Sequence, residues 1–395
     1  MTFSRNILIG ALALGVLSAP VLATAANART ADRGDVVSVT QVEKLSRSQV
    51  ADRLKATGID PARAEHGVNA YRVVYRTVDP KGRPTVASQL VALPDDGRRD
   101  LRVVSWLHGT TVYRGDVASM KKESTDRAAA LLFASTGRAV SAPDYLGLGE
   151  GPGLHPYGDP RSTVTAPLDA LRATRIVAAG QNRRLDRRVL VSGFSQGGPA
   201  TMMVGRALQQ GRDRYFRLGA LAPVGGPFNL TAFETAAAND KVRMASLYLA
   251  YFAIAADRYT DIYRTPSEVF RAPYDKQAET LFDGEHQPQE IAQALPPTSA
   301  KLFTPAFLDR VRNPTGPIKR LFTTLDSTCD WKPGVPVALY HATGDADVAI
   351  DNSRYCLKRL TSYGAAATLT DLGGLDHNQS VRKALPMVVK TFDRA

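Results

Sequence analysis

The sequence predicts an α/β fold in which a mostly parallel central sheet carries helices on both faces and is interrupted by a helical insertion. Two features of the chain lead to this prediction. Short apolar runs alternate with helix-like segments over most of its length, and the alternation stops in residues 229–331, where only helix-like runs occur. A G-x-S-x-G pentapeptide also lies between one apolar run and the helix-like segment that follows it.

The first 28 residues resemble a secretory signal peptide. Arg5 supplies a positive charge, residues 7–22 are apolar, and an A-x-A-like motif ends at Ala28. The apolar run is too short, and too closely followed by a cleavage motif, for a stable transmembrane anchor. We therefore expect cleavage near Ala28 and secretion to the extracellular space or the periplasm.

Residues 29–228 are predicted to form the first part of the α/β core. A short amphipathic helix comes first, and two alternating runs separated by the turn-forming sequence DPKG then indicate a hairpin. The apolar runs that follow alternate with helix-like segments, as parallel strands with crossover helices require. The expected strands are 71–78, 85–93, 102–107, 139–143, 189–191 and 218–224, and the expected helices are 46–58, 128–136, 167–179 and 198–208.

The pattern changes in residues 229–331, which we expect to form a helical lid or cap. Residues 244–256 are almost entirely apolar or small, but they are too few to span a bilayer. They are predicted to form a buried core helix, a helix that lines an apolar pocket, or both. Residues 332–395 are predicted to complete the core with strands 335–340 and 367–372 and helices 352–362 and 379–392.

The charge and the motif content limit the classes of partner. The formal net charge is +12, but the arginines are scattered and the sequence has no zinc-finger spacing and no basic helix. We therefore expect a solvated basic surface, which favours anionic envelopes or lipid–water interfaces, and no nucleic-acid binding. The sequence lacks H-E-x-x-H and C-x-x-C motifs, so no metal site is expected.

The pentapeptide GFSQG at residues 193–197 has the flanks of a nucleophile elbow. Residues 189–191 are typical of a short buried strand, and residues 198–208 carry helix formers with apolar side chains at helical spacing. In this setting Ser195 would sit on a sharp strand-to-helix turn, where small flanking residues relieve the crowding. The alternative is an ordinary glycine-rich turn.

An α/β-hydrolase supplies its catalytic triad in the chain order serine, acid, histidine. Of the six histidines, only His377 follows an acid that itself follows Ser195 at the end of a late strand. The acid is expected in the loop after the preceding strand, where three aspartates compete. Asp345 is favoured because it directly follows a glycine at the usual offset from the strand, and Asp347 is the main alternative. Asp351 fits better as the N-cap of the next helix.

The oxyanion hole of such an enzyme needs two backbone N–H groups. Gln196 directly follows the candidate nucleophile and is the first candidate. The second is expected in the loop after an early strand, in the sequence WLHGT, where Thr110 is the candidate and Gly109 the fallback. His108 is expected to brace this loop, because as the triad base it would break the chain order.

The chain has two cysteines, Cys329 and Cys356, and an even number in an exported chain suggests one disulfide. In the chain-entropy model the bond would contribute on the order of 3.5 kcal/mol. Two buried free thiols are the alternative. Because the cysteines bracket the strand and loop that carry Asp345, a disulfide would also limit movement of this acid.

Five segments, which together span most of the mature chain, carry a resemblance to a known family. They are LHGT at 107–110, SAPDYLGLG at 141–149, HPY at 155–157, GFSQG at 193–197 and YHATGD at 340–345. The chain resembles the secretory lipase family, the fungal lipase A-like α/β-hydrolases. The resemblance implies a helical lid between the strands near residues 218 and 335, and hydrolysis of carboxylic esters, often acylglycerols, without a cofactor. Ala342 and Ala349 depart from the glycine and proline often found there.

We therefore expect a secreted serine carboxylic-ester hydrolase, a lipase or esterase that acts through an acyl-enzyme on acylglycerols or other lipid-like esters. Ser195 would attack the ester carbonyl, His377 would transfer the proton, and Asp345 would orient His377. A secreted peptidase or acyltransferase on the same fold is the alternative, because a triad only activates a hydroxyl. A non-catalytic binding protein is a further alternative.

Overall fold

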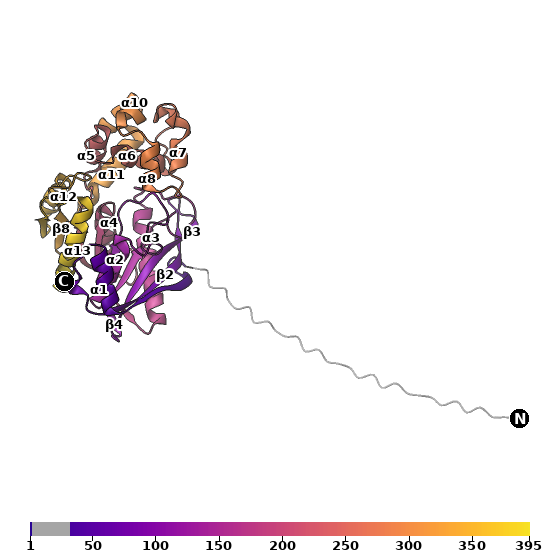
Figure 1. Ribbon diagram of the computed structural model, residues 1–395, viewed down its shortest axis with the longest axis vertical. Coiled ribbons are helices and arrows are strands. Elements are labelled where there is room, and N and C mark those ends of the chain that lie inside the picture. The colour runs from indigo at the N-terminus through magenta and orange to yellow at the C-terminus, as the bar shows by residue number, and fades with distance from the viewer. Residues whose placement is uncertain (2–31) are drawn as a thin grey trace. The chain divides into compact units, whose positions relative to one another are not determined.

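The computed structural model describes Met1 and residues 32–395 (Figure 1). The expected cleavage site near Ala28, and all of the expected signal segment except Met1, therefore lie outside the described residues. Within the described residues, no helix combines the length and the apolar character needed to cross a membrane.

A nine-stranded sheet forms the centre of the molecule, in the order β1-β2-β3-β5-β4-β6-β7-β8-β9. The first three strands are antiparallel to their neighbours, and β4 to β9 run parallel. The prediction of a mostly parallel sheet is confirmed. The strands are β1 Val36–Leu45, β2 Gly67–Val78, β3 Pro84–Asp95, β4 Asp100–Leu107, β5 Arg138–Pro143, β6 Arg184–Phe194, β7 Arg217–Val224, β8 Val337–His341 and β9 Ala367–Asp371.

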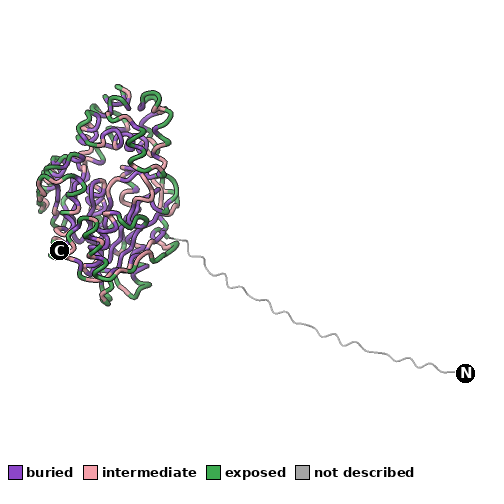
Figure 2. Tube along the Cα trace, in the orientation of Figure 1, coloured by how far each residue is buried: buried purple, intermediate pink, exposed green. Residues whose placement is uncertain are grey.

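Helices cover both faces of the sheet, as the sequence predicts. One face packs against α1 Arg47–Ala56, α2 Thr125–Ser135 and α13 His377–Asp393, and the other against α3 Ser162–Gly180, α4 Gly197–Gln209 and α12 Asp351–Ser362. The inner strands are therefore buried on both sides, which explains why they form continuous apolar runs in the sequence. Figure 2 shows buried residues through the sheet and along the inner sides of these helices.

Helical segments fill the chain between β7 and β8. Figure 1 shows several of them gathered beyond one end of the sheet, and their buried side chains form an apolar cluster of their own. The expected helix at 244–256 is present as α6 and is buried over most of its length. The segments are α5 Leu230–Ala238, α6 Ala245–Thr260, η2 Pro266–Glu268, η3 Tyr274–Lys276, α7 Ala278–Leu281, α8 Pro288–Ala294, α9 Ser299–Leu302, α10 Pro305–Arg312, α11 Gly316–Asp326 and η4 Ser327–Cys329, and a further 3₁₀ turn, η1 Pro61–Arg63, lies in the core.

Several elements differ from the sequence prediction in their bounds or were not predicted, and for three of them the structure shows the reason. Strand β1 was not expected, because two register shifts, at 36–38 and 41–43, break the alternation of apolar and polar residues along this edge strand. Helix α3 begins at Ser162 rather than at 167, because Asp159 accepts a hydrogen bond from the Ser162 N–H at 2.7 Å. Helix α13 begins at His377 rather than at 379, because Asp376 caps it in a capping box.

Candidate active site

The four loops that carry the candidate residues all follow parallel strands. Thr110 comes after β4, Ser195 after β6, Asp345 after β8 and His377 after β9. The carboxyl ends of parallel strands meet at one edge of a sheet, where ligands of open α/β sheets bind. The topology therefore brings residues from four distant parts of the sequence to the same edge.

Ser195 occupies a strained turn between β6 and α4. Its φ of 54° lies in the left-handed region, which non-glycine residues rarely adopt. The Ser195 N–H donates to the Val224 carbonyl at 3.0 Å, which ties the turn to β7. This is the backbone that a nucleophile elbow requires.

The two glycines of the pentapeptide are required by close packing. A Cβ atom on Gly193 would lie 2.4 Å from the Gly197 carbonyl oxygen, and a Cβ atom on Gly197 would lie 1.9 Å from the Leu107 carbonyl oxygen. Any larger residue would overlap the backbone of α4 or of β4. The sequence pattern G-x-S-x-G thus has a steric cause at both ends.

His377 is the first residue of α13 and is buried. Its Nδ1 lies 2.6 Å from Oδ2 of Asp345, and its ring packs against that of Phe194, with 4.5 Å between the ring centres. Within residues 32–395, Nε2 is buried and has no hydrogen-bond partner. The ring is therefore held from its Nδ1 side, and Nε2 remains available to accept a proton.

Asp345 is held by hydrogen bonds to both of its carboxylate oxygens. Oδ1 accepts from the N–H groups of Asp347 and Val348 at 2.9 and 2.8 Å, and Oδ2 faces His377. Nε2 of His341 also lies 3.4 Å from Oδ2. Burial favours the neutral acid, but the hydrogen bonds from the two histidines and from Val348 outweigh it and hold the pKa of Asp345 well below its usual range.

The two competing aspartates have other partners. Asp347 forms a two-point ion pair with Arg243 at 2.6 and 3.1 Å. Asp351 does not cap α12, contrary to expectation: Ile350 occupies the N-cap position, and the exposed Asp351 carboxylate pairs with Arg354 at 2.8 Å. Of the three, Asp345 is the one hydrogen-bonded to His377.

The backbone N–H groups of Thr110 and Gln196 make no hydrogen bond within the described part of the chain. A Cβ atom on Gly109 would lie 3.3 Å from Cβ of Ser195, so the loop after β4 packs directly against the elbow. His108 braces this loop, with Nδ1 2.7 Å from the Gly109 carbonyl oxygen and Nε2 3.1 Å from that of Asp144. Unused N–H groups beside a serine are what an oxyanion hole needs.

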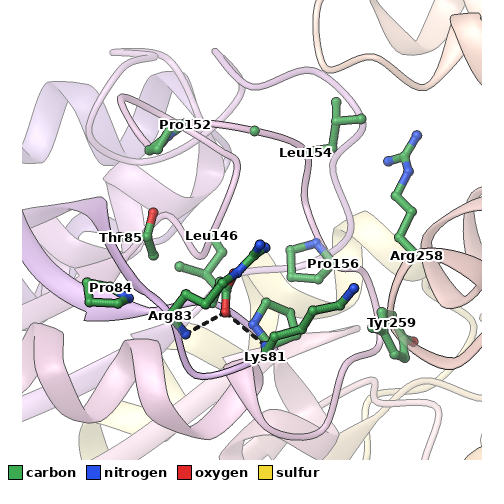
Figure 3. A pocket seen from close by; sticks show the side chains of 13 residues that line it. Lys81, Arg83, Pro84, Thr85, Leu146, Pro152, Leu154, Pro156, Arg258 and Tyr259 are labelled. Carbon is green, nitrogen blue, oxygen red and sulfur yellow. Dashed lines mark hydrogen bonds and ion pairs between the residues drawn. The ribbon is translucent and has the colours of Figure 1, made fainter.

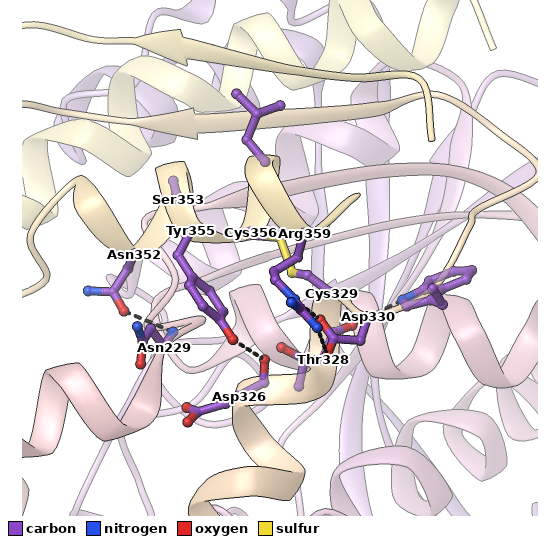
Figure 4. Close-up of a disulfide and its surroundings, with 12 residues drawn as sticks. Asn229, Asp326, Thr328, Cys329, Asp330, Asn352, Ser353, Tyr355, Cys356 and Arg359 are labelled. Atoms are coloured by element: carbon purple, nitrogen blue, oxygen red, sulfur yellow. Dashed lines mark hydrogen bonds and ion pairs between the residues drawn. A yellow bond between two sulfur atoms is a disulfide. The ribbon is translucent and has the colours of Figure 1, made fainter. Parts of the chain in front are cut away.

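The disulfide between Cys329 and Cys356 is present and links η4 to α12 (Figure 4). Two polar contacts lie beside the disulfide. Arg359 pairs with Asp330 at 2.5 Å, and the Tyr355 hydroxyl donates to the Asp326 carbonyl at 3.2 Å. The end of the helical segment is thus fastened to the helix that follows the Asp345 loop.

Two cavities lie near the edge of the sheet that carries the candidate residues. The larger, of about 590 Å³, is a surface cleft between the β2–β3 turn, loop 152–156 and the end of α6 (Figure 3). It is lined by Lys81, Arg83 and Arg258 but by none of the candidate catalytic residues. The smaller, of about 60 Å³, lies beside the elbow and is lined by Gln196. The smaller cavity therefore adjoins the elbow through Gln196, and Ser195, Asp345 and His377 do not line it.

Sequence reasoning missed two residues that support the site. Arg243, which precedes α6, reaches the Asp345 loop through its ion pair with Asp347 and through its N–H, which donates to the Ala346 carbonyl at 3.2 Å. His155 of the HPY segment lies 3.0 Å from the Gln196 side chain. The HPY segment, which contributes to the family resemblance, could have pointed to His155, whereas nothing in the local sequence points to Arg243. Within the described residues, no group of three His, Cys, Asp or Glu side chains could hold a metal ion.

No protein-family model matches the chain, and no curated protein matches it in sequence. Solved structures do resemble it. A Legionella pneumophila protein, whose assignment as a hydrolase is itself provisional, is 25% identical with a TM-score of 0.83, over 91% of this chain and 97% of that one.

Two further solved structures share the fold. The rice cell wall degrading esterase LipA from Xanthomonas oryzae is 24% identical with a TM-score of 0.80, over 92% of this chain and 98% of that one. Candida antarctica lipase A in its closed state is 14% identical with a TM-score of 0.68, over 92% of this chain and 83% of that one. Together with the sheet order, these likenesses show that the chain has the α/β-hydrolase fold, which confirms the predicted fold class.

Proposed function

We propose that the protein is a serine carboxylic-ester hydrolase with Ser195, His377 and Asp345 as its triad. The observation that carries the proposal is the pair formed by Asp345 and His377, in which Nδ1 is 2.6 Å from the carboxylate and Nε2 is buried without a partner. A strained serine elbow follows β6, which β7 separates from β8, at the same edge of the sheet. The hydrolase, esterase and lipase among the structural neighbours support the same class.

In the proposed reaction, Ser195 attacks the ester carbonyl while His377 accepts the hydroxyl proton at Nε2. Asp345 fixes the tautomer with the proton on Nδ1 and stabilises the imidazolium that forms. The N–H groups of Gln196 and Thr110 donate to the oxyanion. His377 then protonates the leaving alcohol, and water cleaves the acyl-enzyme by the same steps in reverse.

The proposal extends to the substrate and the location of the enzyme. Acylglycerols or other lipid-like esters are the proposed substrates, in line with the resemblance to the secretory lipase family, and the helical residues 229–331 are proposed to act as the lid. Secretion is proposed from the signal-like residues 1–28 and agrees with the presence of a disulfide.

The test is a comparison of Ser195→Ala and His377→Ala with the wild type on p-nitrophenyl esters. Each variant should lose at least about three orders of magnitude in kcat/KM, because triad members act as a unit. Circular dichroism would show that the variants remain folded. Substantial activity in Ser195→Ala would contradict the mechanism. A parallel panel of amides and of competing acyl acceptors would reveal peptidase or acyltransferase activity.

A further inference from the structure

The larger cleft, of about 590 Å³, brings together basic side chains from two distant parts of the sequence. Lys81 and Arg83 belong to the turn between β2 and β3, and Arg258 lies in the last turn of α6. Figure 3 shows the three side chains on the walls of the cleft. Lys81 and Arg258 are exposed, so a ligand in the cleft can reach them.

The cleft carries more positive than negative charge. Asp79 is the one carboxylate among its lining residues, and the turn already uses it. Its Oδ2 lies 2.6 Å from Nε of Arg83, and its Oδ1 accepts from the N–H groups of Lys81 and Arg83 at 2.9 and 2.8 Å. Within residues 32–395, Lys81 and Arg258 form no ion pair, whereas Arg83 pairs with Asp79. Two positive charges therefore face the cleft without a carboxylate.

The rest of the cleft is mainly apolar. Four prolines line it, together with Leu146, Leu154 and the ring of Tyr259. Leu154 is 38% exposed, which is unusual for a leucine in this chain. An apolar chain that lies in the cleft would remove this surface from water, and that burial is favourable.

Few uncharged polar side chains remain at the cleft. The Tyr259 hydroxyl donates to the Tyr157 carbonyl at 3.0 Å. Among the lining residues that the structure describes, this leaves the hydroxyl of Thr85 as the uncharged side-chain group without a partner. A sugar acid carries several hydroxyl groups and would leave most of them without a protein partner. The lining therefore favours an anion with an apolar body.

We propose that this cleft binds a fatty acid in its carboxylate form, with the carboxylate near Lys81 and Arg258 and the alkyl chain along the prolines and Leu154. Its volume lies in the range of about 300–1,000 Å³ that is usual for small-molecule sites. Ser195, Asp345 and His377 do not line the cleft, so this is a second site. The proposed ester hydrolysis supplies only the source of the ligand, as the acid that it releases.

The test measures the affinity of the protein for three ligands by isothermal titration calorimetry. Octanoate has both the carboxylate and the alkyl chain, octan-1-ol has the chain without the charge, and propionate has the charge without most of the chain. The catalytic serine is first labelled with a long-chain phosphonate, so that acyl groups cannot bind there. If no label forms on folded protein, the proposed function fails, and the affinities are then measured on the unlabelled protein.

We expect octanoate to bind at least about 10-fold more tightly than propionate, because each buried CH₂ group adds affinity. It should bind about 5-fold more tightly than octan-1-ol, because the carboxylate pairs with the two free cations. Added salt should weaken the binding of octanoate and leave that of octan-1-ol nearly unchanged.

The double variant Lys81→Gln/Arg258→Gln locates the site. It should lower the affinity for octanoate by about 5-fold, to that of octan-1-ol, and change the affinity for octan-1-ol by less than about 2-fold. Lys122→Gln/Arg264→Gln is the matched control, because it removes two exposed charges that do not line the cleft, and it should change neither affinity. Leu154→Ala should weaken the binding of both ligands, because each uses the apolar wall.

Circular dichroism would show that all variants remain folded. Equal affinities of the wild type for octanoate and octan-1-ol would overturn the inference, and so would the absence of octanoate binding. An affinity for octanoate that is unchanged in Lys81→Gln/Arg258→Gln, or that falls equally in the control variant, would also overturn it, since the carboxylate would then bind elsewhere or respond only to the net charge.

Discussion

The α/β core and the helical residues 229–331 are held in place by different kinds of contact. The core is built on a sheet whose inner strands are apolar and buried on both faces, and every proposed catalytic residue comes shortly after one of the parallel strands. The helical part has its own apolar cluster and meets the core partly through polar contacts. Arg243 pairs with Asp347, and Arg114 of the core pairs with Glu285 at 2.9 Å.

We therefore expect the core and the helical part to contribute to activity in different ways. Packing at the sheet edge determines whether the proposed catalytic groups can meet at all. The helical part closes the small cavity and reaches the Asp345 loop from outside, so it adjusts the position of groups that the core already supplies. Substitutions in the core should therefore affect folding, and substitutions at the junction should mainly affect rate and substrate preference.

The largest effect is expected for Gly197→Ala in the core. The new Cβ atom would lie 1.9 Å from the Leu107 carbonyl oxygen, and neither backbone can move without disrupting the sheet. We expect a loss of more than about 4 kcal/mol in the free energy of unfolding, measured by chemical denaturation, or no folded protein.

The matched control for Gly197→Ala is Gly180→Ala. Gly180 ends α3 and has no atom within 4 Å of its Cβ position, so alanine should stabilise the helix by up to about 1 kcal/mol. Gly197→Ala protein with a stability close to that of the wild type would show that the elbow is not closely packed.

Removal of the disulfide should have the next largest effect. Cys329 and Cys356 are 27 residues apart, and a double replacement by alanine should cost about 3–4 kcal/mol of the free energy of unfolding. Reductant added to the wild type should lower the Tm in the same way and release two titratable thiols. An unchanged Tm after full reduction would mean that the junction does not depend on this bond.

Arg243→Ala tests the contact between the helical part and the Asp345 loop. The change leaves the Asp347 carboxylate without its partner, while the Asp347 N–H still donates to Asp345. We expect a decrease of about 10-fold in kcat with little change in KM, because small displacements of a catalytic group reduce rate more than binding. Because the Arg243 side chain is about half exposed, its removal opens the Asp347 carboxylate to water, which keeps the effect on stability small.

Arg354→Ala is the control for Arg243→Ala. Arg354 also pairs with an aspartate after β8, but both side chains of that pair are largely exposed, so its loss should leave kcat and the Tm unchanged. Equal kcat values for Arg243→Ala and the wild type would indicate that the core alone positions Asp345.

The smallest effect is expected for Glu234→Gln in α5. Glu234 is buried, Oε2 has no partner within the described residues, and burial raises the pKa of its carboxyl well above the usual value. The unfolded chain loses this proton near pH 4.3, so stability falls as the pH rises above that point. Glutamine cannot ionise, so the stability of the variant relative to the wild type should increase from pH 4 to pH 8.

Denaturation of both proteins at pH 4, 6 and 8 measures this difference. Glu123→Gln, at an exposed position, is the control and should show no such trend with pH. A Glu234→Gln advantage that is the same at all three pH values would show that the carboxyl ionises in the folded state much as it does in the unfolded chain.

The sequence was sufficient for eight of the nine strands, for the helices that cover the sheet and for the loop of each candidate residue, because buried strands and elbow glycines leave local patterns. It left Asp345 and Asp347 in competition, because they are two residues apart and differ only in their distant partners, His377 and Arg243. Strand β1 escaped notice because two register shifts interrupt the apolar–polar alternation of this edge strand.

The His155–Gln196 contact could not be predicted for a similar reason. The residues are 41 positions apart, and their hydrogen bond depends on which ring nitrogen of His155 carries the proton. That in turn depends on the Leu146 carbonyl, which no side-chain pattern encodes. Contacts between loops at the sheet edge therefore had to come from the structure.

The most direct test of the central claim is to label the wild type with a fluorophosphonate and map the modified peptide by mass spectrometry. We predict one label per chain, attached to Ser195, and a labelling rate at least about 1,000-fold lower in His377→Ala, because the base that activates the serine is gone. A label on another residue, or no label on protein that hydrolyses esters, would contradict the account.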